Sequence, residues 1–67
     1  MRGIEFYYQK FADIISKSDK DLSCTFNDYT KTHTPNYVYL WLEKKVKDGI
    51  ISEEINNYMS DFYWEIR

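Results

Sequence analysis

Apolar side chains recur at three- and four-residue intervals along the first segment of the chain, as they do on one face of an α-helix. The apolar positions are Ile4, Tyr7, Tyr8, Phe11 and Ile15, with Ala12 and Ile14 beside them. The opposite face carries Gln9, Asp13 and Lys17. This spacing predicts a first helix from about Gly3 to Ser16.

A short second helix is indicated after this segment. Ser18 or Asp19 can cap its start, because serine and aspartate side chains accept hydrogen bonds from the first free backbone N–H groups. Leu22, Phe26 and Tyr29 then share one helical face. A polar connection over residues 30–34 is expected to follow.

A third helix is predicted from about Pro35 to Asp48. Thr34 followed by Pro35 is typical of a helix start, and Gly49 is typical of a helix end. Three lysines near the end suit the negative pole of the helix dipole. They are Lys44, Lys45 and Lys47. Ile50, which comes directly after the glycine, is expected to fold back onto the last turn.

The same two segments also fit a pair of strands. Leu22, Cys24 and Phe26 alternate with polar residues, and Tyr37 to Leu42 is apolar on every side. A hairpin between residues 22–29 and 37–42 would make an α+β fold, which stays open as the alternative. The start, stop and terminal charges of the third segment favour the helix.

The last segment has the clearest helical pattern. Ser52 is a cap candidate, and Glu53 and Glu54 lie in the first turn, where the helix dipole favours acidic side chains. One face carries Ile55, Tyr58, Met59, Phe62 and Ile66. We therefore predict an all-α fold, a small orthogonal four-helix bundle that forms a single domain over residues 1–67.

The composition indicates the cellular compartment and the kind of source organism. Cys24 is the only cysteine, so an internal disulfide is excluded and a reducing, cytoplasmic compartment is expected. The longest apolar run, Tyr37 to Leu42, is far short of the roughly 20 residues that span a bilayer, so no membrane association is expected. Abundant Ile, Lys, Asn, Tyr and Phe indicate AT-rich codons, as in a low-GC bacterium, its phage or a mobile element.

No residue pattern indicates catalysis. His33 is the only histidine and falls in a polar stretch, and Cys24 lies among apolar residues that favour a small core position. The acidic pairs, Asp19 with Asp21 and Glu53 with Glu54, fall where helices are expected to start, so capping is their expected role. Two glycines cannot make a phosphate-binding loop. We expect no enzyme activity, no cofactor and no metal site.

The aromatic content is the strongest pointer to function. Thirteen rings in 67 residues exceed what so small a core readily covers, and surplus aromatic side chains favour binding. At 100° per residue, Phe6 lies about 200° from Ile4, and Trp64 lies about 180° from Ile55. The candidate partner-binding residues are Phe6, Tyr39, Leu40 and Trp64. The competing interpretation is that the terminal helices bury both sides and Phe6 packs against Trp64.

The order of features resembles the YozE-like family of small bacterial helical domains, which have a SAM-like fold. Phe6 and Tyr7 lie near the start of the chain, and Asp61 to Trp64 lies near its end. Between them, Lys31 to Glu43 contains a lysine–threonine loop followed by an apolar helix. The dense Tyr37 to Leu42 block departs from that family's more polar helix. The resemblance carries over no functional residue.

Two classes of function follow from the sequence. The leading hypothesis is a small protein-binding module or inhibitor that occludes a partner protein through an exposed aromatic patch. The alternative is a helix-turn-helix regulator that binds DNA as a dimer, with Tyr39, Glu43 and Lys47 facing outward. The net charge of −2 disfavours nucleic acid as the partner. A symmetric homodimer would also use the surplus rings.

Overall fold

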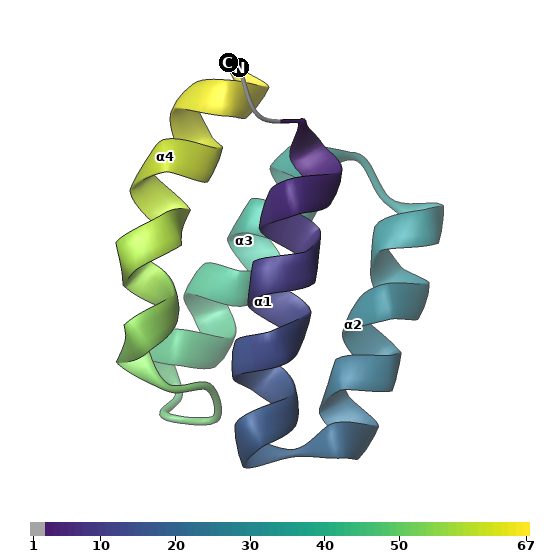
Figure 1. Ribbon diagram of the computed structural model, residues 1–67, viewed down its shortest axis with the longest axis vertical. Coiled ribbons are helices and arrows are strands. Elements are labelled where there is room, and N and C mark those ends of the chain that lie inside the picture. Colours follow the sequence, from purple (N-terminus) through teal and green to yellow (C-terminus); the bar gives the residue numbers. More distant parts are fainter. Residues whose placement is uncertain (1–2) are drawn as a thin grey trace.

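A computed structural model describes residues 3–67, and these fold into four α-helices joined by short turns (Figure 1). The helices are α1 (Ile4–Ser18), α2 (Lys20–Thr32), α3 (Pro35–Lys47) and α4 (Asn56–Ile66), and a single 3-10 turn, η1 (Glu53–Ile55), leads into α4. Successive helices run in alternate directions, so the start of α1 and the end of α4 lie at the same end of the bundle (Figure 1). The predicted all-α fold of four helices is confirmed, but the helices lie alongside one another in alternate directions and do not cross at right angles as an orthogonal bundle would (Figure 1). The hairpin alternative is excluded, because residues 22–29 and 37–42 lie within α2 and α3.

Asp19 is the only residue between α1 and α2, and it serves both helices. Its backbone N–H donates to the Ile15 carbonyl at 2.8 Å, which closes the last turn of α1. Its carboxylate accepts from the backbone N–H groups of Asp21 and Leu22 at 2.9 and 3.2 Å, which caps α2. The predicted cap is confirmed, although α1 extends two residues beyond the predicted Ser16 end.

The polar connection predicted for residues 30–34 is mostly helix. α2 continues to Thr32, and its threonine hydroxyls bond back into the helix. The Thr30 hydroxyl donates to the Asn27 carbonyl at 2.7 Å, and the Thr32 hydroxyl donates to the Asp28 carbonyl at 3.3 Å. A threonine that finds a backbone acceptor one turn earlier can remain helical despite its polar character.

The end of α3 follows the predicted glycine stop. Gly49 has a φ of 78°, in the left-handed region that favours glycine. Its N–H donates to the Val46 carbonyl, and the Ile50 N–H donates to the Lys45 carbonyl, both at 3.0 Å, which is a Schellman motif. Only the backbone of Ile50 folds back as expected, because its side chain is 45% exposed. Ile51, at 3% exposure, enters the core instead.

Three fully buried phenylalanines from three different helices form the centre of the core. The ring of Phe11 on α1 meets Phe26 of α2 edge to face, with centroids 6.3 Å apart. It meets Phe62 of α4 in the same way at 5.2 Å. Val38 and Leu42 of α3 are also fully buried. Burial of each such side chain stabilises the fold by about 1.5 to 3 kcal/mol.

The core position expected for Cys24 belongs to Ser23. Cys24 is exposed, whereas Ser23 is buried and its hydroxyl donates to the Ala12 carbonyl of α1 at 3.2 Å. Ser23 and Phe26 lie three residues apart, so they share the face of α2 that packs against α1. A small serine with a backbone acceptor fills that position without an unpaired polar atom. His33, which the sequence placed in a polar stretch, is exposed.

Candidate functional site

The four predicted binding residues divide into two exposed and two partly buried side chains. Trp64 on α4 is 66% exposed, and Leu40 on α3 is 56% exposed. Tyr39 and Phe6 are partly buried and pack against the core. The helical projection therefore identified Trp64 and Leu40 as surface side chains, while it overlooked the neighbours that cover part of Tyr39 and Phe6.

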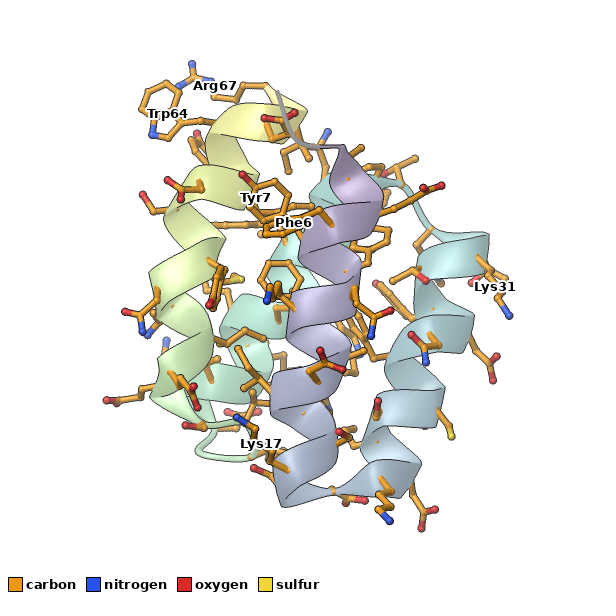
Figure 2. All side chains as sticks on the ribbon, viewed as in Figure 1. Phe6, Tyr7, Lys17, Lys31, Trp64 and Arg67 are labelled. Carbon is orange, nitrogen blue, oxygen red and sulfur yellow. The ribbon has the colours of Figure 1, made fainter. Side chains whose placement is uncertain are left out.

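Trp64 and Tyr39 belong to one surface, and Tyr63 connects them. The Tyr63 ring lies 5.3 Å from the Tyr39 ring and 5.8 Å from the Trp64 ring, measured between centroids. The guanidinium carbon of Arg67 lies 5.5 Å from the Tyr63 centroid and 5.2 Å from the Trp64 centroid. We call these four side chains the α3–α4 aromatic surface. Trp64 and Arg67 extend away from the bundle at the end of α4 (Figure 2).

Tyr39 anchors this surface to the protein interior. Its ring stacks against the buried Phe62 at 6.5 Å, with the planes 23° apart. Burial raises the pKa of Tyr39, and the carboxylate of Glu43, one turn further along α3, raises that pKa further by its charge and by accepting a hydrogen bond. Tyr63 contributes a smaller increase. The raised pKa favours the neutral phenol.

Phe6 is not joined to Trp64 by ring contact. Its ring meets Tyr7 edge to face at 5.3 Å, and the ammonium nitrogen of Lys10 lies 5.6 Å from its centroid. Figure 2 shows Phe6 against α1, whereas Trp64 points away from the bundle. The expectation that these two rings pack together is therefore wrong. Phe6 covers the edge of the core beside Tyr7, which itself contacts Phe62 of α4 at 5.8 Å.

Leu40 lies on the outer side of α3. At 100° per residue it is about 180° from the mean direction of the buried Val38 and Leu42. Tyr39 projects about 100° from Leu40, toward α4. The two neighbours in sequence therefore do not share one surface.

The sequence reasoning overlooked Tyr63 and Arg67. Their four-residue separation, with Trp64 three residues before Arg67, places all three side chains within reach of each other on α4. That spacing, together with a cationic residue after two aromatic ones, is a signal that the sequence contained.

A second set of rings joins α2 to α3. Tyr29 and His33 stack face to face, with centroids 3.8 Å apart and planes 6° from parallel. Tyr29 also stacks with Trp41 at 5.6 Å, and the Lys45 ammonium nitrogen lies 5.6 Å from the Trp41 centroid. Trp41 in turn contacts the buried Phe26 at 5.7 Å. These stacked rings fasten the end of α2 to α3, which gives them a structural role.

A shallow groove of about 440 Å³ lies where α1 meets the start of the C-terminal segment. Its lining residues are Lys10, Asp13, Ile14, Ser16, Lys17, Glu54 and Tyr58. Two lysines and two carboxylates balance each other, so its charge selects neither anions nor cations. Among residues 3–67, no group of three or more His, Cys, Asp or Glu side chains is placed to hold a metal ion. None of the helices in the described part of the chain has the length and apolar character needed to cross a membrane.

Comparison with known proteins returned no matching family model, no matching curated protein and no matching solved structure. The resemblance to the YozE-like family thus has no family match behind it. Functional inference depends on the surface of this chain alone.

Proposed function

We propose that this protein is a small, non-enzymatic protein-binding module that acts through the α3–α4 aromatic surface. The observation that carries the proposal is the 66% exposure of Trp64 beside Tyr63 and Arg67. Trp, Tyr and Arg are the residue types that contribute most to binding energy at protein interfaces. A tryptophan left mostly in water on a small domain has apolar area that only a partner would cover.

The surface is supported from below by the core. Tyr39 stacks on the buried Phe62. Tyr63 then packs on Tyr39. Rings fixed in this way lose little conformational entropy when a partner binds, which favours affinity.

Binding to a partner's functional surface would make the protein an inhibitor by occlusion, which requires no catalytic group of its own. The single cysteine supports a cytoplasmic location, and the codon bias supports a phage or mobile element of a low-GC host as the source. Both belong to the proposal.

The DNA-binding alternative receives less support from the geometry. Its outward-facing residues were Tyr39, Glu43 and Lys47. Tyr39 is packed against Phe62 and Tyr63, so one of the three side chains is engaged within the protein. The carboxylate of Glu43 also repels phosphate. We therefore retain protein as the partner.

The test compares the native chain with Trp64→Ser and Leu40→Ser, each immobilised and exposed to a lysate of the source organism. We expect a retained protein that Trp64→Ser loses and Leu40→Ser keeps, because the two side chains are similarly exposed but only Trp64 belongs to the surface. Far-UV circular dichroism checks that helicity is unchanged. Equal retention by the native chain and Trp64→Ser would contradict the proposal.

A further inference from the structure

We propose that the α3–α4 aromatic surface binds an arginine or lysine side chain of a basic protein segment, in the place that Arg67 occupies in the free chain. This inference rests on the proposed function and specifies the chemistry of the partner. It follows from the geometry of two rings, from the side chain that lies over them, and from the distribution of charge along the chain.

Tyr63 and Trp64 form two walls of a corner. Their ring planes are 78° apart and their centroids 5.8 Å apart. The Arg67 guanidinium carbon lies 5.5 and 5.2 Å from the two centroids, inside the roughly 6 Å range of a cation–π contact. A cation therefore already finds favourable positions against both rings. Trp64 nevertheless stays 66% exposed, so its indole has surface to offer a second molecule.

The charges around this corner favour a cationic partner. Residues 52–67 contain four of the eleven acidic side chains but only one of the nine basic ones, Arg67. The acidic side chains are Glu53, Glu54, Asp61 and Glu65. Glu53 and Glu54 lie on η1, at the end of α4 opposite Trp64, whereas Asp61 and Glu65 lie within one turn of Trp64 along α4 (Figure 1). Two carboxylates, Asp61 and Glu65, therefore lie near the corner against the one cation Arg67, so a basic segment would be attracted to it and an acidic one would be repelled.

Arg67 acts as an internal competitor in this arrangement. While the Arg67 guanidinium lies over the rings, an incoming cation must displace it. The apparent affinity is then the intrinsic affinity multiplied by the fraction of molecules in which Arg67 has left the rings. Loss of the Arg67 charge should therefore strengthen binding of a cation. A purely apolar contact with Trp64 would not respond in this way.

The experiment titrates two capped tripeptides, Gly-Arg-Gly and its analogue in which neutral citrulline replaces arginine, into the full chain labelled with nitrogen-15. Citrulline has the shape of arginine without its charge. We expect arginine to bind about two- to fivefold more tightly, as an exposed cation–π contact provides. The indole N–H signal of Trp64 should move, and that of Trp41 serves as the internal reference because it packs against Phe26 and Tyr29.

Variants separate the cation site from general charge effects. Arg67→Gln should tighten binding of the arginine peptide by about two- to fivefold, because the variant removes a competing cation–π contact of similar strength. Lys31→Gln removes an equal charge from α2, on the other side of the molecule from Trp64 (Figure 2), and should change the affinity less. Trp64→Phe should keep part of the arginine preference, whereas Trp64→Leu, which is apolar but has no ring, should lose it.

Equal affinity for the arginine and citrulline peptides would overturn the inference. So would an equal response to Arg67→Gln and Lys31→Gln. If protein capture still depended on Trp64 in that case, the cation site would fail while the proposed function stood. Capture that is unaffected by Trp64→Ser would overturn the proposed function itself.

Discussion

The rings of Phe11 and Phe62 meet edge to face, with centroids 5.2 Å apart and planes 88° from each other, and both side chains are fully buried. This contact joins α1 to α4, which are the first and last helices of the chain and lie near each other in the bundle (Figure 1). The same Phe62 ring supports Tyr39 on the aromatic surface. One core side chain thus connects the stability of the fold with the proposed binding site.

Replacement of Phe62 by alanine is expected to lower the free energy of unfolding by about 3 to 5 kcal/mol, because a large buried ring is lost and a cavity is left. A chain of this size has a total stability on the order of 3 to 10 kcal/mol, so the variant should be close to unfolded. Urea denaturation followed by circular dichroism measures the change. Trp64→Ala is the control and should stay within about 0.5 kcal/mol of the native chain, as surface substitutions do. A loss for Phe62→Ala no larger than the control's would contradict the packing described.

Asp19→Ala should destabilise the protein by about 1 kcal/mol, because the carboxylate accepts from two backbone N–H groups at the start of α2. Thr34→Ala provides the matched comparison. Thr34 stands at the N-cap of α3, but its side chain makes no capping hydrogen bond there. Thermal unfolding should show a larger fall in melting temperature for Asp19→Ala. Equal shifts would show that the Asp19 carboxylate has no capping role.

Gly49→Ala should cost about 1 to 2 kcal/mol, since alanine at a φ of 78° is in the left-handed region that L-residues avoid. No atom lies within 4 Å of the position a Cβ would take, so the penalty comes from the backbone alone. Gly49→Asn should cost less, because asparagine tolerates this region better than alanine. Both variants are compared by urea denaturation, and a neutral Gly49→Ala would exclude the Schellman geometry at the end of α3.

Stability should fall at alkaline pH through Tyr39. Burial and the Glu43 carboxylate raise the pKa of this phenol above its usual value near 10 in the folded protein. Because the folded pKa is raised, the contribution is complete below the unfolded pKa and is lost as pH rises through the folded one. Tyr39→Phe should therefore flatten the loss of stability above about pH 10. Burial also raises the pKa of Tyr8, so part of the alkaline loss should remain.

Denaturation midpoints measured at several pH values on either side of the phenol titration test this prediction. Tyr37→Phe is the control, since Tyr37 is an exposed tyrosine on the same helix. The effect of Tyr39→Phe is measured relative to this variant. Identical profiles for the native chain and Tyr39→Phe would contradict the role given to Glu43 and to burial.

Local signals made most of the fold predictable from the sequence. Asp19 caps α2 and Ser52 caps the 3-10 turn η1 through their own side chains, and Gly49 stops α3 through its own backbone freedom. None of these effects needs knowledge of distant residues. The ambiguous Tyr37 to Leu42 block was resolved in favour of the helix by the Pro35 start and the Gly49 stop, which the structure confirms.

The surface was harder to predict because it depends on how helices meet. A helical projection separates the core face from the outer face, and it was sufficient for Trp64. It cannot show that Phe62 and Tyr63 of α4 cover part of Tyr39, since that requires the position of α4 against α3. The sequence also predicted Cys24 as a core residue, whereas Ser23 is the buried one, and this too depends on how two helices meet. The cause is the hydrogen bond that Ser23 donates to the Ala12 carbonyl on a neighbouring helix.

The oligomeric state is the last prediction, and charge decides it. A symmetric dimer through the α3–α4 aromatic surface would bring two copies of α4 together, each with the acidic side chains of Asp61 and Glu65. Like charges at close range oppose such pairing, so the protein should remain a monomer of 8.2 kDa at low salt. Light scattering over a concentration series measures the mass. A mass that rises toward twice this value would assign the exposed rings to self-association and remove the need for an outside partner. A stable monomer would leave Trp64 uncovered by the protein itself, as the proposed function requires.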